Sequence, residues 1–370
     1  MRVALVHDWL TGMRGGERVL EALVTLFPEA TLFTLVHRPH RLTPSLEARP
    51  IRSSFIQRLP LAPRRFRHYL PLFPAAVERF DLSGFDLVIS TSHCVAIGAR
   101  TPPATCHIGY CFTPMRYAWD LRETYLAGAG PLGRLALAPL LDRLKRWDRA
   151  AGQRPGFLAC ISHHVAERIR RHWGREARVI YPPVRTARFV PDGRPPEDFF
   201  LIVSALAPYK RLDVAVEAFT RLRWPLRVIG DGAEAARLRR LAGPTVSFLG
   251  WQDDRVLAEQ YARCRAFVFP AEEEFGIAPL EAMAAGRPVI GYARGALLET
   301  SLDGVTGLFF AEQTPESLID ALRRFELTGF DADKIRAHAL RFRQERFLGE
   351  MAAYVEECLA RHRGAGAVRC

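Results

Sequence analysis

The sequence lacks any apolar run long enough to cross a membrane, and it lacks paired cysteines. No stretch of its 370 residues approaches the roughly 20 apolar residues that a transmembrane helix needs. His7 and Asp8 interrupt the first apolar run early, so we expect a strand there rather than an export signal. The seven cysteines include no C-x-x-C pair, which favours reduced thiols in a cytoplasm over a disulfide scaffold or a zinc site.

Lysine is scarce, since only three of the 52 basic residues are lysine, and the charge is unevenly distributed. Residues 1–190 hold 28 Lys and Arg against 14 Asp and Glu, whereas residues 191–370 hold 24 against 26, so the net charge of +12 comes from the first half. Two clusters there, residues 64–69 and 143–147, mix basic and aromatic side chains. Such clusters suit an anionic surface, either phospholipid headgroups or a nucleic-acid backbone, and a plain solvated basic face is the alternative.

Short apolar runs alternate with amphipathic stretches, which is the pattern of a parallel α/β sheet. The predicted strands are residues 3–7, 31–36, 87–91, 107–112, 157–160 and 179–181, then 200–204, 226–229, 246–249, 266–269, 289–292 and 308–310. Between these two series lies a segment with five prolines, residues 181–198, which we interpret as a linker. The fold class predicted is therefore α/β, with two doubly wound parallel-sheet (Rossmann-like) domains facing a central cleft.

The stretch 267–290, FVFPAEEEFGIAPLEAMAAGRPVI, carries the strongest signal of a site. A buried strand is followed by three glutamates, by Phe275-Gly276, and by a short helix that we expect Pro279 to open. Strand, acidic loop, glycine and helix N-terminus form a pocket at the carboxyl edge of a parallel sheet, suited to a polar ligand with a phosphate. Glu281 lies in a small apolar helix and needs hydrogen-bond partners, for which ribose hydroxyls are suitable, although a surface salt bridge is the alternative.

Two further loops follow predicted strands and precede predicted helices. Gly15 and Gly16 would let the backbone approach a ligand, but their loop is not the G-x-G-x-x-G dinucleotide fingerprint. Lys210 and Arg211 oppose the dipole of the helix they open, which is reasonable if a phosphate neutralises them; a solvated pair is the alternative. Asp253 is predicted to cap a helix rather than to bind a metal.

Several motifs together resemble a known family. EEEFGIAPLEAMAAGRPV resembles the E-x7-E signature of glycosyltransferase family 4, which comprises retaining enzymes of the GT-B fold. The family's order is also followed by VHDWLTGMRGGERVLEAL, YCFTPMRYAWD, ACISHHVAERIRRHWG, VIYPPVRTARF, APYKRLDVAVEAF and FLGWQDDRVLAEQYARCRAFVFP. The resemblance covers nearly the whole chain and is closest to the mannosyltransferase-like branch of surface-polysaccharide assembly.

The resemblance implies roles for individual residues. Glu281 would bind the ribose of the donor, Glu273 would lie beside the donor sugar, and Lys210 would neutralise the diphosphate leaving group. Glu273 and Lys210 are thus the implied catalytic residues. The implied donor-binding residues are Gly15, Gly16, Lys210, Arg211, Phe275, Gly276, Ile277 and Glu281. The residues implied for the acceptor side or the cleft are His93, Phe112 and Arg116, with a structural role as the alternative for His93.

The function implied by the resemblance is transfer of a hexose, with GDP-mannose as the leading donor, to a glycan or lipid-linked acceptor in polysaccharide biosynthesis. Residues 1–185 would bind the acceptor, a helix from about residue 345 to 370 would pack back on them, and residues 186–345 would bind the nucleotide sugar. No metal or other cofactor and no nucleic acid is expected. We expect a cytoplasmic protein, peripheral on the inner face of the plasma membrane, with an anionic membrane surface as a further partner.

Two alternatives stay open at this point. A GT-B nucleotide-sugar epimerase or phosphorylase would use the same fold, and a weakened, non-catalytic binding protein would use the same donor pocket. The sequence departs from the family's pattern at two positions that bear on this choice. Ala205 stands where the family usually has an arginine five residues before the lysine, and Phe112 stands where members often carry a histidine.

Overall fold

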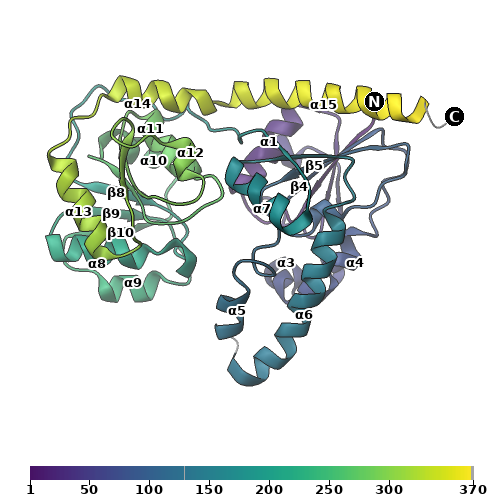
Figure 1. Cartoon of the computed structure of the whole chain (residues 1–370), viewed down its shortest axis with the longest axis horizontal. Helices are drawn as coiled ribbons and strands as arrows, with labels where there is room; N and C mark the ends of the chain where they lie inside the picture. Colours follow the sequence, from purple (N-terminus) through teal and green to yellow (C-terminus); the bar gives the residue numbers. More distant parts are fainter. Residues whose placement is uncertain (129, 368–370) are drawn as a thin grey trace. The chain divides into compact units, whose positions relative to one another are not determined.

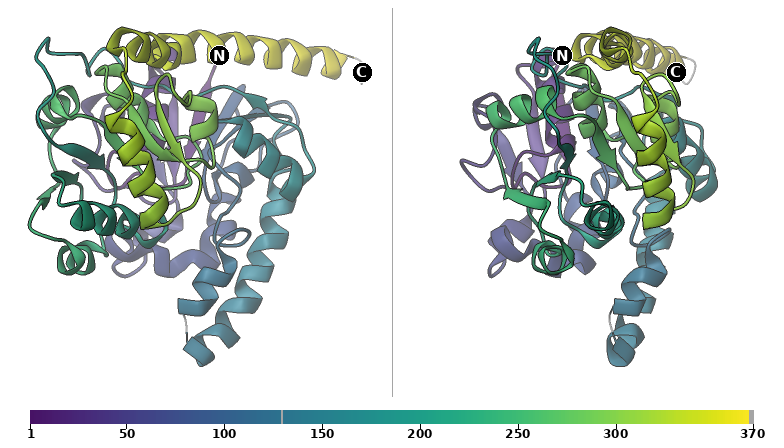
Figure 2. Two further views of the ribbon diagram at one scale, coloured as in Figure 1. Left: turned by 60° about the vertical axis from the view of Figure 1, so that its left-hand side comes forward. Right: turned by 90° about the vertical axis from the view of Figure 1, so that its left-hand side faces the viewer.

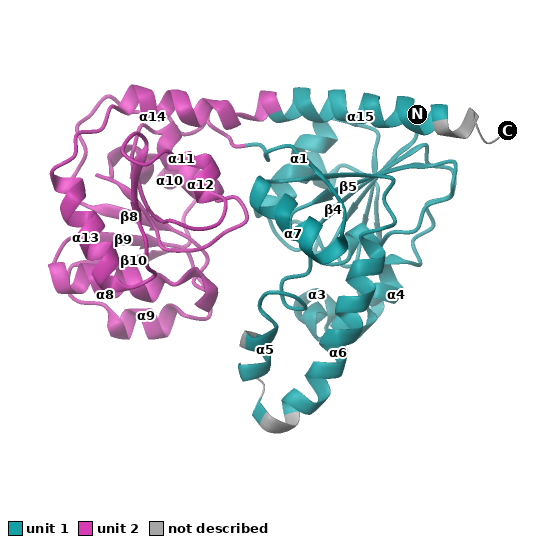
Figure 3. Cartoon of the chain, viewed as in Figure 1, with its two compact units in different colours: residues 1–183, 347–370 teal, residues 184–346 magenta. Residues whose placement is uncertain are grey.

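The chain forms two compact units, which Figure 3 colours separately. The computed structural model describes residues 1–128 and 130–367, with the side chains of residues 124, 131, 132 and 365–367 left out. Unit 1 holds residues 1–183 and the C-terminal segment that begins at Phe347, and unit 2 spans Val184–Arg346. The division thus falls between Pro183 and Val184, inside the proline-rich segment.

Unit 1 is built on a seven-stranded sheet whose paired strands all run parallel. Its strands are β1 (Val3–His7), β2 (Thr31–Thr34), β3 (Ile51–Ser53), β4 (Leu87–Ser92), β5 (Cys106–Cys111), β6 (Phe157–Cys160) and β7 (Arg178–Val179). They lie in the order β3-β2-β1-β4-β5-β6-β7, so the direction of winding reverses between β1 and β4. Every residue of β1, β4 and β5 is buried, as expected for central strands covered on both faces.

The helices of unit 1 connect these strands and cover the sheet (Figure 1). They are α1 (Gly15–Leu26), α2 (Pro44–Glu47), η1 (Phe55–Arg58), α3 (Ala62–Arg65), η2 (Phe66–Leu72), α4 (Phe73–Val77), η3 (Ala96–Gly98), α5 (Arg122–Gly128), α6 (Gly130–Ala151), α7 (His163–Trp173) and α15 (Gln344–Ala367), where η marks a 3-10 helix. Ser162 caps α7, because its hydroxyl accepts a hydrogen bond from the N–H of Val165. The part of α15 in unit 1 packs on the sheet through the Tyr354 hydroxyl, which donates to the Leu158 carbonyl at 2.9 Å.

The pair α5 and α6 forms a hairpin that extends away from the rest of unit 1 (Figures 1 and 2). The chain enters it from β5 and returns through α6 to β6. An ion pair between Arg122 and Asp142, at 3.0 Å, joins the two helices. The 22 residues of α6 span roughly 33 Å, whereas a six-residue strand such as β5 spans about 20 Å.

Unit 2 repeats the arrangement with a six-stranded parallel sheet. Its strands are β8 (Phe200–Val203), β9 (Leu226–Ile229), β10 (Val246–Gly250), β11 (Phe267–Phe269), β12 (Val289–Tyr292) and β13 (Gly307–Phe310), in the order β10-β9-β8-β11-β12-β13. Its helices are η4 (Pro208–Lys210), α8 (Leu212–Leu222), α9 (Ala235–Leu241), α10 (Asp254–Arg263), α11 (Ile277–Ala284), α12 (Leu297–Thr300), α13 (Pro315–Glu326), α14 (Ala332–Ala339) and η5 (Leu340–Phe342). The winding reverses between β8 and β11.

Both units therefore have the doubly wound parallel α/β architecture that the sequence predicts. Asp253 caps α10 as predicted, with its side chain accepting from the N–H groups of Arg255 and Val256. Pro279 does not open α11, which begins two residues earlier at Ile277 with Gly276 as its N-cap. The expectation was wrong because Gly276 adopts a positive φ of 83°, so the chain turns into the helix there. Within the described residues, no helix combines the length and the apolar character that a membrane span requires.

Candidate functional site

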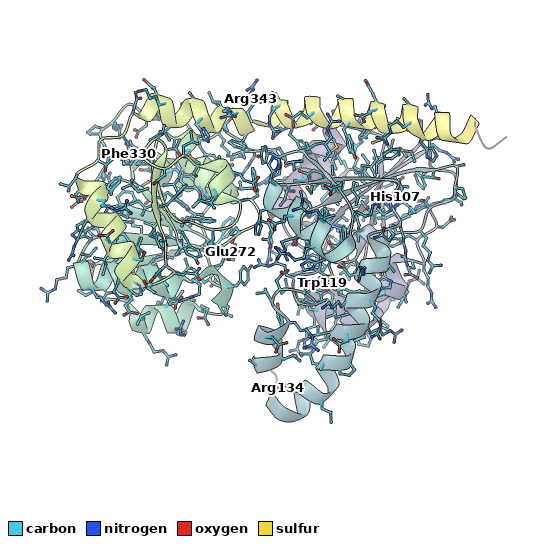
Figure 4. The ribbon with its side chains drawn as sticks, viewed as in Figure 1. His107, Trp119, Arg134, Glu272, Phe330 and Arg343 are labelled. Atoms are coloured by element: carbon cyan, nitrogen blue, oxygen red, sulfur yellow. The ribbon has the colours of Figure 1, made fainter. Side chains whose placement is uncertain are left out.

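The candidate site of unit 2 lies where the strand order reverses. In doubly wound sheets this switch point leaves a crevice at the carboxyl ends of the two strands, because their connections leave on opposite faces. In unit 2 those strands are β8, which leads into η4 and Lys210, and β11, which leads into the loop with Glu273. Glu272, labelled in Figure 4, marks this acidic loop. The two residues predicted to be catalytic thus lie in the connections that follow the two strands at the switch point.

Lys210 and Glu273 form an ion pair between the Lys210 Nζ and the Glu273 Oε1. Their side chains are only 15% and 17% exposed, so water screens the pair less than it would on an open surface. A charge in such a place needs a partner, because removing it from water costs free energy that only an opposite charge or hydrogen bonds can offset. The structure therefore brings together two residues that are 63 positions apart in the sequence.

Arg211 belongs to a hydrogen-bond network that links the β8 loop to the β11 loop. Its Nε lies 3.2 Å from an Asp213 carboxylate oxygen, and its guanidinium donates to the Gln313 side-chain oxygen at 3.1 Å. The Gln313 amide in turn donates to the Pro270 carbonyl at 2.7 Å, at the end of β11. Arg211, predicted to bind the donor, thus already contacts Asp213 and Gln313 in this structure, and the sequence did not indicate Gln313.

The N-terminus of α11 faces the end of the acidic loop. Phe275 is buried and packs against Phe342 with 6.0 Å between ring centres, Gly276 is the N-cap, and Ile277 is the first helical residue. The N–H groups of these residues lie at the positive end of the helix dipole, where anions and hydroxyl oxygens are bound favourably. Phe275, Gly276 and Ile277, predicted from the resemblance to bind the donor, thus follow Glu273 within four positions of the chain.

The loop after β12 fixes the backbone of Glu273. The Ala296 N–H donates to the Glu273 carbonyl at 3.0 Å. Gly295 adopts a φ of +65°, and a Cβ placed on it would lie 2.5 Å from the same carbonyl oxygen. Only glycine fits this approach, so Gly295 is part of the site although the sequence gave no reason to select it.

Glu281 has a protein partner that sequence reasoning missed. The Tyr261 hydroxyl, on α10, lies 3.1 Å from the Glu281 Oε2 and donates to it. Burial, followed by the nearby Glu281 charge, raises the pKa of Tyr261 well above its usual value, so the hydroxyl keeps its proton. Tyr261 is completely buried and packs edge-on against Phe189, which fixes the direction of the hydroxyl and hence of the carboxylate.

The glycines after β9 support the β8 loop instead of lining a separate site. Gly230 adopts a φ of +132°, and a Cβ on it would lie 1.9 Å from the Ser204 carbonyl oxygen. A Cβ on Gly232 would lie 2.3 Å from the Leu206 carbonyl oxygen. Ala205 lies between Ser204 and Leu206 in the β8 loop, and its side chain is exposed.

Unit 1 has its own charged group at its switch point, centred on Asp8. Asp8 follows β1 directly and is 1% exposed. One carboxylate oxygen accepts from the N–H groups of His93 at 2.7 Å and Cys94 at 3.0 Å, and the other accepts from Val95 and Ala96 at 2.7 Å each. Asp8 therefore determines the shape of the loop that follows β4.

His93, predicted for the acceptor side, is oriented by the same carboxylate. Its Nδ1 lies 3.1 Å from Asp8, and its ring packs edge-on against Trp9 with 4.5 Å between ring centres. The His93 side chain is 36% exposed although Asp8 is completely buried. With Nδ1 directed at Asp8, Nε2 is the ring nitrogen available for a ligand hydroxyl.

Gly15 and Gly16 were predicted to lie in the loop before the first helix, but they are the first two residues of α1, whose N-cap is Arg14. Gly16 approaches two rings. A Cβ on Gly16 would lie 3.2 Å from both the His7 and the Phe112 ring atoms. His7 is buried, its Nδ1 lies 2.7 Å from the Thr91 hydroxyl, and burial lowers its pKa to about 4. Phe112 is 9% exposed, so it presents an apolar ring beside this helix N-terminus.

A second buried carboxyl group of unit 1 belongs to Glu17. Glu17, in the first turn of α1, is buried and accepts from the Arg14 N–H at 3.1 Å. Burial raises its pKa to about 7.

Arg116, predicted for the acceptor side or the cleft, is half-buried in the loop between β5 and α5. Across the described residues, no group of three or more His, Cys, Asp or Glu side chains is placed to hold a metal ion.

Comparison with known proteins identifies the domain in unit 2. Residues 197–326 match the family model described as "Glycosyl transferases group 1", so unit 2 carries a domain of this type. The D-inositol 3-phosphate glycosyltransferase of Geodermatophilus obscurus is 32% identical over 219 residues, 49% of this chain and 48% of that protein. The O-antigen chain mannosyltransferase C of Escherichia coli is 31% identical over 134 residues, 34% of this chain and 36% of that protein. The chain spans about half the length, or less, of the curated relatives it matches.

A solved structure similar over nearly the whole chain is that of Anabaena Alr3699/HepE in complex with UDP and glucose. It matches with a TM-score of 0.71 and 15% identity, covering 95% of this chain and 99% of that one. At this identity the likeness concerns the fold, which is therefore the α/β, GT-B type that was predicted.

Proposed function

We propose that this protein is a glycosyltransferase that moves a hexose from a nucleotide diphosphate sugar to a hydroxyl of a glycan or lipid-linked acceptor. The observation that carries the proposal is the Lys210–Glu273 ion pair at the switch point of unit 2. The pair lies inside the segment that matches the group 1 glycosyltransferase model. Similarity to sugar-transferring relatives over part of the chain supports the same conclusion.

Lys210 and the N-terminus of α11 can stabilise the leaving group. Breaking the bond between the anomeric carbon and the diphosphate oxygen leaves negative charge on the diphosphate and positive charge on the sugar. A fixed ammonium and a helix N-terminus placed at the developing anion stabilise the transition state more than the ground state. A bound diphosphate would compete with Glu273 for the Lys210 ammonium, and the Glu273 carboxylate would then be available to the sugar hydroxyls.

Glu281 and Tyr261 can hold the ribose of the donor. One Glu281 oxygen accepts from the Tyr261 hydroxyl, and a carboxylate has further lone pairs with which to accept from ribose hydroxyls. Because Tyr261 is completely buried, the carboxylate is oriented before the donor arrives. On the acceptor side, we assign His93 to the acceptor hydroxyl, with Asp8 orienting the ring.

The finer assignments are also part of the proposal. Retention of configuration, membership of family 4 and a role in polysaccharide assembly are supported by the E-x7-E resemblance of Glu273 and Glu281. GDP-mannose is the leading donor because a mannosyltransferase is among the relatives, and UDP-glucose is the next because a structural neighbour was solved with UDP and glucose. We propose that no metal is required, and that the protein acts in the cytoplasm.

A thermal-shift experiment with nucleotides tests the donor site. We expect either GDP and GDP-mannose or UDP and UDP-glucose to raise the melting temperature, because ligand at 100 times its Kd stabilises the folded state by about 2.7 kcal/mol. Glu281→Gln should weaken that nucleotide about ten- to a hundredfold, since it removes the charge from a hydrogen-bond acceptor. This variant keeps an oxygen for the Tyr261 hydroxyl, so it should fold normally.

Tyr125→Phe serves as the matched control, because Tyr125 is exposed in unit 1, far along the chain from the donor site. It should bind nucleotide like the parent. The donor-site assignment is wrong if Glu281→Gln also binds like the parent. The proposed function is wrong if no nucleotide diphosphate or nucleotide sugar shifts the melting temperature at all.

A further inference from the structure

Large apolar side chains are exposed at two segments of unit 1. Among its described side chains, the exposed large apolar ones apart from Met1 are Leu61, Leu72, Tyr125 and Leu135, at 63%, 40%, 52% and 78%. The first two lie in residues 58–72, here called the basic segment, and the others lie in the described residues 125–128 and 133–136, here called the hairpin tip. Scattered exposed leucines are ordinary, but their concentration in two segments marks an interaction surface.

The basic segment combines these leucines with arginines that have no acidic partner. Residues 48–77 contain six arginines and no aspartate or glutamate. Arg58, Arg64, Arg65 and Arg67 are all exposed, and none forms an ion pair with a described residue. Four positive charges beside exposed leucines attract an anionic surface that also offers an apolar layer.

The hairpin tip is almost without charge. Residues 124–141 contain one charged side chain, Arg134, which is labelled near the end of the hairpin in Figure 4. Its Nε donates to the Leu126 carbonyl at 2.8 Å, so the arginine ties α6 to α5. Leu135 follows Arg134 and is among the most exposed large apolar residues of the chain. A weakly charged tip that projects from the rest of unit 1 lacks the salt-bridged polar face usual for a solvated helix (Figure 2).

One apolar cluster anchors both segments. Phe66 of the basic segment and Leu144 of α6 belong to the same buried cluster, and Leu70 and Leu140 pack against it. The α6 helix ends just before β6, at the amino edge of the sheet, so its other end reaches past the carboxyl edge. That edge carries the Asp8–His93 pair. The hairpin tip and the candidate acceptor residues are therefore at the same edge of the unit 1 sheet.

We propose that the basic segment and the hairpin tip dock unit 1 on an anionic lipid bilayer. Tyr125 and Leu135 enter the interface between headgroups and acyl chains, where tyrosine is favoured because its ring is apolar and its hydroxyl is polar. The arginines of the basic segment pair with lipid phosphates. Neither contribution alone gives stable attachment, but apolar insertion and electrostatic attraction act together. The orientation of the carboxyl edge toward a lipid-linked acceptor rests on the proposed function, whereas bilayer binding does not.

Two other occupants fit these residues less well. A second copy of the chain would bring two basic segments together, and like charges repel. A nucleic acid would satisfy the arginines but would leave Leu61, Leu72 and Leu135 exposed to water. A bilayer accounts for both the charge and the apolar side chains.

Vesicle flotation tests the proposal. The full chain is mixed with phosphatidylcholine vesicles prepared with and without phosphatidylglycerol, and the bound fraction is measured at low and high salt. Two variants carry the test. The tip variant combines Tyr125→Ser and Leu135→Ser. The arginine variant combines Arg64→Gln, Arg65→Gln and Arg67→Gln. The matched control replaces an exposed arginine and an exposed leucine of unit 2, as Arg323→Gln with Leu327→Ser.

We expect the parent and the control to float with phosphatidylglycerol vesicles and to be released by high salt. The arginine variant should bind on the order of 100-fold more weakly, given the contribution of each arginine near an anionic surface. The tip variant should bind about ten- to a hundredfold more weakly, because two apolar side chains no longer enter the interface. Both variants should keep the nucleotide-induced shift in melting temperature, which separates loss of docking from loss of the donor site.

Three results would overturn the docking proposal. The first is equal binding of parent and both variants to anionic vesicles, and the second is equal binding of the parent to neutral and anionic vesicles. The third is a parent that binds no vesicles and instead self-associates in sedimentation or binds duplex DNA, with the same substitutions abolishing that association or DNA binding. If nucleotides do not raise the melting temperature of the parent, that result would instead count against the proposed function alone.

Discussion

Two pairs of polar side chains, the Asp8 carboxylate with the His93 ring and the Lys210 ammonium with the Glu273 carboxylate, stand at equivalent places in the two units. Asp8 and His93 follow the two strands at the switch point of unit 1, and Lys210 and Glu273 lie in the connections that follow those of unit 2. In each pair the carboxylate residue is tied to a neighbouring loop, since the Asp8 side chain accepts from four N–H groups and the Glu273 backbone carbonyl accepts from the Ala296 N–H. Charges so placed are held before any ligand arrives, which is what electrostatic catalysis requires.

Glu17 makes the stability of unit 1 depend on pH. Burial raises its pKa from 4.5 to about 7, so the folded state binds this proton more tightly than the unfolded state does. Its contribution to stability is complete below about pH 4.5 and is lost as pH rises through 7, by about 3 kcal/mol at most. Glu17→Gln keeps an acceptor for the Arg14 N–H and removes the titration.

We therefore expect thermal unfolding of the parent and of Glu17→Gln to respond differently to pH. Between pH 4.5 and 7 the parent should lose stability relative to the variant. Comparing the two proteins cancels the other titrating groups, among them His7, whose lowered pKa acts in the opposite direction. A difference in melting temperature that stays constant across this range would contradict the account.

At this scale the sequence indicated some members of the site and not others. Glu273 and Glu281 belong to one continuous motif that follows an apolar strand, so their roles could be inferred without the structure. Tyr261 lies on another helix, 20 residues before Glu281. From the sequence alone, its place on the apolar side of that helix resembles that of an ordinary core residue. For Asp8 a signal existed, because a carboxylate directly after a buried strand needs partners, but nothing in the sequence identifies the N–H groups that bind it.

At the scale of elements, the loop after β12 is as important as the acidic loop it touches. Gly295→Ala should destabilise the fold by about 2–4 kcal/mol, because alanine is unfavourable at positive φ and its Cβ collides with the Glu273 carbonyl. Since the collision displaces Glu273, transfer should also slow. Gly304→Ala is the matched control, with a φ of +72° and no atom within 4 Å of its Cβ.

The two glycine variants separate backbone strain from displacement of Glu273. Chemical denaturation and nucleotide release are measured on both proteins. Gly304→Ala should lose about 1–2 kcal/mol from its unfavourable φ alone and should keep its transfer rate. Equal stability and equal activity of the two variants would show that the Gly295 contact does not position Glu273.

Most elements could be predicted from the pattern of apolar runs, and the exceptions have physical causes. The central strands begin as apolar runs, VALV in β1 and LVI in β4, because both faces of the sheet are covered there. The edge strand β3 (Ile51–Ser53) was not predicted, because two of its three residues are exposed. The α5–α6 hairpin was not predicted either. Glycines and prolines interrupt its periodicity, and among the described side chains of its tip only Leu126 is buried.

At the scale of the whole molecule, the uneven charge of the sequence matches a division between units. The excess of positive charge lies in residues 1–190, nearly all of which belong to unit 1. The docking surface uses part of that excess, whereas many arginines elsewhere in unit 1 are already paired, for example Arg154 and Arg100 with Glu78. The charge of residues 191–370 is nearly balanced, and at the proposed donor site Lys210 pairs with Glu273 and Arg211 pairs with Asp213.

The most direct test of the central claim is the rate at which the protein releases nucleotide from GDP-mannose or UDP-glucose in the presence of membrane-extracted acceptors. The account predicts release from one of these donors by the parent and by the unit 2 control variant, Arg323→Gln with Leu327→Ser. It predicts at least a ten- to a hundredfold slower rate for Lys210→Ala and for Glu273→Gln, because each loses a charged interaction made with the donor. Release by both variants at the parent's rate would contradict the account.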